Sequence, residues 1–239
     1  MELMQEVRAG TFRLAASLLL AGVLASIIAG VFHAGSHDAN DHVASFTAYA
    51  NSGIWTAVHL GQFVGMALVC AALVSLWAAL EVRQHAVAWV ARFGALSAAA
   101  ALALYAALQA VDGVALKKAV DAWAASPEPE KAARFAAAEG IRWLEWGMRS
   151  YQSFLLGAAL VLLGIAVAAT HRVPRIIGLL MALSGLAYVA QGWIIGESGF
   201  SDANSLPTLV GIVAIVATSV WLAVSAWRMK QTTAAGHLR

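Results

Sequence analysis

Six stretches of this chain are long and apolar enough to cross a bilayer, and this feature restricts the fold more than any other. About 20 helical residues span the hydrocarbon core. We place the spans at residues 14–32, 54–80, 87–111, 141–170, 176–195 and 206–227. Backbone polar groups in lipid have to be satisfied within each segment. We therefore predict an all-α polytopic membrane bundle in one transmembrane domain, residues 1–239, in contact with the lipid bilayer.

Composition agrees with this class and excludes others. The chain is 61% hydrophobic and 12% charged, whereas soluble domains have about 25% charged residues. A net charge of +2 gives no basic surface for nucleic acid. The single cysteine, Cys70, excludes a disulfide framework and a CxxC pair. No GxSxG elbow and no P-loop is present.

Basic residues near the span ends predict the orientation. Arginines lie before the first span, at Arg8 and Arg13, and after the last, at Arg228. Loops 33–53 and 196–205 contain neither lysine nor arginine. By the positive-inside rule, both termini are expected in the cytoplasm.

The long loop between the third and fourth spans is expected to contain a short amphipathic helix. Leu116, Val120 and Trp123 share one face at helical spacing, with Lys117 and Asp121 as an i,i+4 pair beside it. Such a helix would lie on the outer membrane surface, as a connector or as a lid over the bundle.

Polar side chains within the spans gather toward one side of the membrane. Charge at membrane depth costs roughly 2.5–3.5 kcal/mol per residue, so such groups are functional candidates. We expect a buried pocket in the outer half of the bundle that binds a small molecule or lipid. His59 and Glu145 are its candidate acid–base groups, and its other candidate ligand-binding residues are Gln62, Gln109, Asp112, Arg142, Arg149, Gln152, Tyr188 and Gln191.

Three interpretations of this cluster stay open. It could be the site of a membrane enzyme, with Arg142 or Arg149 holding an anion. It could belong to a transporter of small molecules or ions. It could also be a structural network in a non-catalytic subunit, held by interhelical hydrogen bonds and an Arg149–Glu145 ion pair. The sequence decides neither between them nor on an oligomeric state.

The loop after the first span suggests metal binding. Its histidines, together with His59 and two aspartates, form a nitrogen and oxygen donor set suited to zinc or iron. The candidate ligands are His33, His37, His42, His59, Asp38 and Asp41. Three ligands and an open position would produce a metal-bound water for hydrolysis. No HExxH motif is present.

Two other cofactors are alternatives. Calcium could bind the oxygen side chains of two similar loop segments, Asp38 and Asn40 with Asp202 and Asn204. A haem could be held between His33 and His59.

Several blocks of sequence resemble a known family. They are the run from His42 to Ser52 followed by Trp55, His59-Leu-Gly-Gln62 and Gly65, then Gln109-Ala-Val-Asp112-Gly113, and Arg142-Trp-Leu-Glu145-Trp-Gly147. They are similar to blocks in uncharacterised multi-pass bacterial membrane proteins of a domain-of-unknown-function family. The resemblance covers most of the chain and implies a six-helix fold in a bacterial cytoplasmic membrane, with no activity to carry over.

Overall fold

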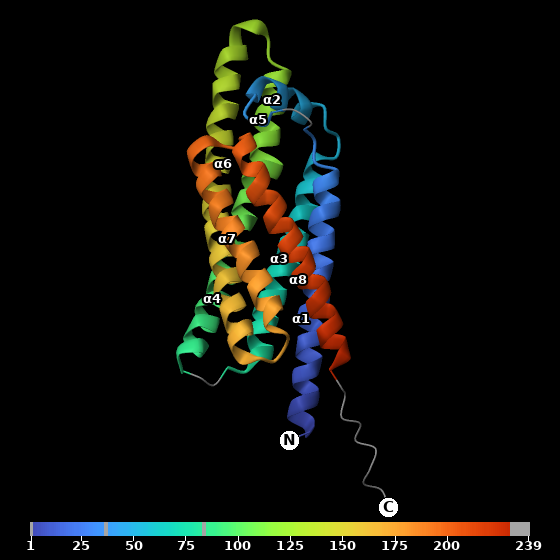
Figure 1. Cartoon of the computed structure of the whole chain (residues 1–239). Helices are drawn as coiled ribbons and strands as arrows, with labels where there is room; N and C mark the ends of the chain where they lie inside the picture. The colour runs from blue at the N-terminus through green and yellow to red at the C-terminus, as the bar shows by residue number, and fades with distance from the viewer. Residues whose placement is uncertain (1, 36–37, 83–84, 230–239) are drawn as a thin grey trace, which may run out of the picture.

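The computed structural model describes residues 2–35, 38–82 and 85–229 (Figure 1). These residues form helices and loops, with no strand among them. The α-helices are α1 (Glu2–Val31), α2 (His42–Ala50), α3 (Trp55–Leu80), α4 (His85–Ala110), α5 (Lys117–Ala124), α6 (Glu128–Thr170), α7 (Arg175–Ser198) and α8 (Ser205–Arg228). A π-helix, η1 (Val111–Leu116), joins α4 to α5, and a 3-10 turn, η2 (Asp202–Asn204), precedes α8.

Six helical stretches in the described part of the chain are long and apolar enough to span a membrane, which confirms the predicted all-α polytopic bundle. They are Glu6–Val31, Trp55–Leu80, His85–Ala124, Glu128–Thr170, Arg175–Ser198 and Asp202–Arg228. The start of α1 and the end of α8 lie at the same end of the bundle (Figure 1). We call the opposite end, where α2 and α5 lie, the distal end. The side of the membrane that each end faces stays a prediction.

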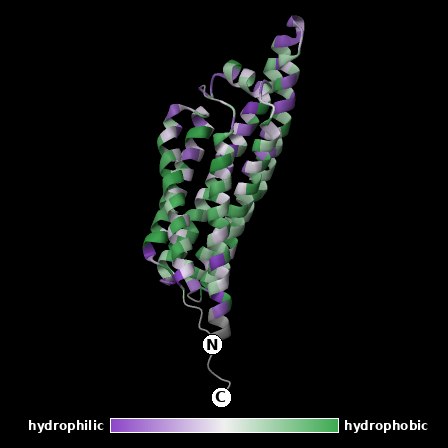
Figure 2. Cartoon of the chain, turned by 90° about the vertical axis from the view of Figure 1, so that its right-hand side faces the viewer, coloured by the Kyte–Doolittle hydropathy of each residue, from purple (hydrophilic) through white to green (hydrophobic). Residues whose placement is uncertain are grey.

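The six spans pack as a closed ring in chain order. Each span contacts the next one, and α8 returns to contact α1. In the half of the ring nearer the termini, the interior is filled by large apolar side chains such as Leu73, Leu76, Leu80, Leu163 and Ile177, all buried. Strongly hydrophilic residues are sparse along the middle of the bundle (Figure 2). This half is a packed apolar core.

Glycines set the closest helix contacts. A Cβ added at Gly157 would lie 2.7 Å from the carbonyl oxygen of Gly185, and one added at Gly164 would lie 2.6 Å from that of Gly178. α6 and α7 therefore pack backbone against backbone along two turns, as small residues permit in membrane bundles. Gly22 of α1 makes a similar approach to α3.

The distal end carries more structure than the sequence predicts. Residues 33–53, expected as a loop, contain α2, whose N-terminus is capped by Asp41 accepting from the backbone N–H of Ala44 at 3.0 Å. α5 covers most of the segment expected to be amphipathic, and it continues the line of α4 through η1 (Figure 1). Its position at a membrane surface stays a prediction. A small aromatic core, including Phe46 and Trp55, joins α2 and α5 to the bundle.

Candidate functional site

The π-helix η1 places Asp112 inside the bundle. π-turns inside α-helices occur frequently at functional sites, because the extra residue per turn redirects side chains and frees carbonyls. Two carbonyls of η1 accept bonds from α3: the Trp55 indole N–H donates to Asp112 O at 3.0 Å, and the Thr56 hydroxyl donates to Gly113 O at 3.3 Å. These bonds hold the π-turn against α3 and fix the backbone of Asp112.

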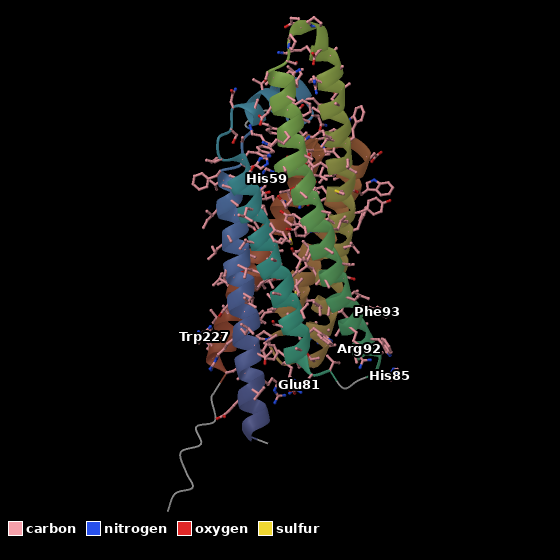
Figure 3. The ribbon with its side chains drawn as sticks, turned by 180° about the vertical axis from the view of Figure 1, so that it is seen from behind. His59, Glu81, His85, Arg92, Phe93 and Trp227 are labelled. Carbon is pink, nitrogen blue, oxygen red and sulfur yellow. The ribbon has the colours of Figure 1, made fainter. Side chains whose placement is uncertain are left out.

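Gly113 lets α3 approach the same turn closely. A Cβ at position 113 would lie only 2.7 Å from the Cβ of His59. The His59 side chain, 2% exposed, is therefore held directly against η1. Figure 3 shows His59 in the distal part of α3, beside α4.

The hydrogen bonds of His59 determine its tautomer. Its Nδ1 atom lies 2.8 Å from the carbonyl oxygen of Trp55 and has to carry a proton to donate there. If the ring is neutral, the Nε2 atom then carries a lone pair and no proton. This Nε2 atom lies 3.0 Å from Oδ2 of Asp112. The second carboxylate oxygen, Oδ1 of Asp112, is buried without a hydrogen-bond partner in the described structure. A lone pair beside a carboxylate requires a shared cation, either a proton or a metal ion.

His33, just beyond the end of α1, completes a group of three. Its ring centroid lies 5.2 Å from that of His59. One ligand atom from each of His33, His59 and Asp112 lies within 4.8 Å of the other two. Burial lowers the pKa of His33, although the Asp112 carboxylate acts in the opposite direction. The neutral imidazole, which is the form that binds metal, is therefore favoured at neutral pH.

The three residues fit a small divalent ion. Tetrahedral zinc with bonds of about 2.0–2.1 Å separates its ligand atoms by roughly 3.3 Å. His59 Nε2 and Asp112 Oδ2 are already near that separation, so only His33 has to move inward. A metal-bound histidine usually donates its other ring N–H to a carbonyl or carboxylate, as His59 does to Trp55. Because Asp112 shares the space between the two rings, a single ion fits better than a haem plane.

A cavity of about 370 Å³ opens beside this group and extends toward α6. His33 and Asp112 form part of its wall. Across the cavity, Glu145 forms a buried ion pair with Arg142. The Arg142 guanidinium also donates to the carbonyl oxygen of Ala39 at 3.4 Å and lies 5.0 Å from the ring centroid of Phe200.

Arg149 extends the polar wall of the cavity. Its guanidinium donates to Oε1 of Gln152 at 3.2 Å and to Oε1 of Gln191 at 3.3 Å. Among the described ion pairs, none involves Arg149, so neutral amides are its partners. Arg149 also lines a smaller hollow, of about 70 Å³, together with Tyr188 and Gln191.

The structure brings most of the predicted polar residues together. Those that line the large cavity are Gln62, Gln109, Asp112, Arg142, Glu145 and Arg149. Gln152, Tyr188 and Gln191 lie around Arg149 outside it. The expected Arg149–Glu145 ion pair is wrong. Glu145 pairs with Arg142, one helical turn before it on the same face.

Other predicted metal ligands have different partners. His42 Nδ1 lies 2.8 Å from Oε1 of Glu139, and Asp41 caps α2. Asp38 accepts from the backbone N–H of Asn40 at 2.9 Å. His37 lies outside the described residues. Within the described structure the three-residue ligand group contains none of His42, Asp38 and Asp41; His33 and His59 remain candidates, joined by Asp112.

The residues proposed for calcium are close in space. Asp38, Asp202 and Asn204 line one surface hollow, and Asn40 donates to the carbonyl oxygen of Ser198 at 2.9 Å. The two similar loops are therefore neighbours at the distal end, in an arrangement that loop-to-loop hydrogen bonding explains.

Two tyrosines of the cavity wall were not among the predicted site residues. Tyr49 comes from α2, and burial raises its pKa to about 12, so it stays a neutral hydroxyl. Tyr105 lies on α4 at four and seven residues before Gln109 and Asp112. That helical spacing could have identified Tyr105, whereas Tyr49 depends on a helix that the sequence does not predict.

Fold and composition define the class: this is an all-helical, multi-pass integral membrane protein. More specifically, the chain belongs to the DUF4386 family, a domain of unknown function whose family model matches residues 14–226. No curated protein and no solved structure matches it significantly.

Proposed function

We propose that this chain is a metal-assisted enzyme of a bacterial cytoplasmic membrane, acting on an anionic small molecule or lipid in the distal cavity. The observation that supports this most strongly is the pairing of His59 Nε2 with Asp112 Oδ2 at 3.0 Å, while Nδ1 is used by Trp55. With His33 as the third ligand, these residues would form a three-ligand set of the kind that holds catalytic zinc.

The cavity supplies the remaining parts of a hydrolytic site. A zinc ion held by these residues would supply Lewis-acid chemistry, by which water is activated near neutral pH to hydrolyse a carbonyl or phosphoryl substrate. Hydrolysis removes a proton from the water and delivers one to the leaving group. Glu145 lines the cavity and would carry that proton from one to the other. Arg149, which has amide partners, can offer its positive charge to an anionic substrate.

The apolar half of the bundle favours an enzyme over a transporter. A transported solute needs a polar route past the midplane. The described interior nearer the termini is instead filled by leucines such as Leu73, Leu76 and Leu163. A purely structural network is less well supported, because Oδ1 of Asp112 and Oε1 of Gln109 are buried and make no hydrogen bond within the described structure.

The test is elemental analysis of protein purified from zinc-supplemented cells without chelators. We expect about one zinc ion per chain in the wild type, and loss of it in His59→Ala and Asp112→Asn. The control is His171→Ala, which changes an exposed histidine at the opposite end of the bundle. Wild-type protein without metal, or full occupancy in both site variants, would overturn the proposal.

A further inference from the structure

A second hollow lies on the outside of the bundle, between α3 and α4. Its volume is about 290 Å³, and its walls include Leu60 and Phe63 from α3 and Ala106 and Ala110 from α4. Thr56 to Phe63 rise by roughly 10 Å at 1.5 Å per residue, so the hollow is an elongated groove. Both helices belong to candidate spans.

The groove faces the hydrocarbon of the bilayer. Leu60 beside it is 62% exposed, and Val114 at its other rim is also exposed. In a membrane, apolar side chains exposed between two spanning helices meet lipid rather than water. The molecule that can enter the groove from this side is therefore one with a hydrocarbon chain.

The groove and the polar cavity are separated by residues that belong to the candidate site. His59 lines the groove, and its Nε2 atom faces Asp112, which lines the polar cavity. Gln109 lines both spaces. Its Nε2 atom donates to Gln62 at 3.4 Å, and its Oε1 atom is buried with no partner in the described structure. Because one long hydrogen bond holds the Gln109 side chain, this side chain can move aside at small cost.

We propose that the groove holds the chain of a single-chain anionic amphiphile whose head enters the cavity past Gln109. This inference deepens the proposed function and rests on it, since it names the class of substrate. Arg149 would hold the anionic head. The polar end and the apolar end of such a molecule match the two adjoining spaces on either side of Gln109.

The groove is expected to decide where the chain lies more than how tightly it binds. Lipid tails are as apolar as leucine, so moving a chain from bilayer to groove gains little free energy. Blocking the groove should therefore exclude long-chain ligands from this position, while leaving the metal group and the polar cavity intact.

The test uses two photoreactive probes in lipid nanodiscs, a C16 fatty acid and a C16 lysophosphatidic acid, each with a mid-chain diazirine. Cross-linked residues are mapped by peptide mass spectrometry. We expect labels on α3 and α4 around Leu60 and Ala106, reduced about tenfold in Ala110→Trp because the filled groove shifts the chain into the surrounding lipid by that factor. Ala106→Leu replaces that variant if it does not fold.

The matched control is Leu96→Trp, a lipid-facing position on α4 that is 64% exposed and away from the groove.

The probe that labels the groove tells whether carboxylate or phosphate heads are accepted. Groove labelling no higher than labelling around Leu96, or unchanged by both filling variants, would overturn the inference. Zinc measured in the same samples separates the two proposals: zinc without groove labelling contradicts only the amphiphile, and groove labelling without zinc contradicts only the metal.

Discussion

His59 and Asp112 meet with Nε2 and Oδ2 3.0 Å apart, inside a bundle where each of them alone would be costly to bury. The contact depends on two backbone features on the α4 side. η1 directs Asp112 inward, and Gly113 leaves room for the imidazole. A local change in helix type thus determines which residues form the candidate site.

Gly113→Ala should disturb this contact without removing a ligand. The added methyl group would lie 2.7 Å from the Cβ of His59, so the ring has to shift. Changes that reorient a metal ligand typically weaken affinity 10–100-fold, and we expect zinc affinity, measured by competition with a chelator, to fall by about that factor. Gly147→Ala, which has no heavy atom within 4 Å of the new methyl, should bind zinc normally. Equal affinities in both variants would contradict the account.

Trp55→Phe tests the anchoring of the π-turn. It keeps an aromatic ring beside His59 but removes the N–H that donates to Asp112 O. Leaving a buried carbonyl without its partner costs about 1–3 kcal/mol, and we expect a loss of that size in unfolding free energy in detergent. Trp193→Phe, at a 67% exposed position on α7, is the control and should change stability by less than about 0.5 kcal/mol. An unchanged unfolding free energy in Trp55→Phe would show that η1 does not depend on this hydrogen bond.

Glu145→Gln should be one of the more destabilising single substitutions in the cavity. It leaves the buried Arg142 guanidinium without its carboxylate, and breaking a buried pair on one side costs about 3–5 kcal/mol. The comparison is Glu130→Gln in the exposed Glu130–Arg134 pair, for which about 0–1 kcal/mol is expected. Similar unfolding free energies for the two variants would mean that the cavity is well hydrated and the pair contributes little.

The pH dependence of zinc binding should follow the proton that zinc displaces between His59 and Asp112. Their Nε2 and Oδ2 atoms lie 3.0 Å apart, and a proton held there has to leave before a metal ion binds. Burial lowers the pKa of His33 below its ordinary value of 6.5, so His33 adds competition only at lower pH. Zinc affinity should therefore fall as the pH is lowered, and an affinity that is unchanged from about pH 8 to about pH 5.5 would contradict the site.

The metal-free protein provides a second readout of the same shift. Between the lowered pKa and 6.5, the unfolded chain binds a proton at His33 that the folded chain does not. Stability therefore rises with pH across this window and is lost as pH falls through it. His33→Gln should remove that part of the pH dependence of the melting temperature, and an unchanged profile would count against the assignment.

Much of the fold is predictable from apolar length alone, because an apolar stretch of about 20 residues satisfies its backbone in lipid as a helix. The grouping of Arg142, Glu145 and Arg149 also follows from helical spacing on one long helix. α2 could not be predicted in the same way, since nine residues carry too little periodicity and its stability comes from packing Phe46 and Tyr49 against α5 and Trp55.

The metal group shows where sequence reasoning fails. The sequence groups His42 and Asp41 with His33 because all three lie in one short loop, but Asp41 caps a helix and His42 pairs with Glu139. Asp112 is recognisable as a polar residue within a span, yet its contact with His59 depends on η1. No residue pattern in Val111–Leu116 identifies a π-turn, because that turn is stabilised by bonds from α3.

The central claim is most directly tested by X-ray absorption at the zinc edge of protein purified from zinc-supplemented cells. We predict a first shell of nitrogen and oxygen only, at about 2.0–2.2 Å, with the multiple-scattering signature of two imidazoles, reduced to one imidazole in a His33→Gln variant. A shell containing sulfur, a shell without imidazole, or a spectrum unchanged in that variant would contradict the site formed by His33, His59 and Asp112.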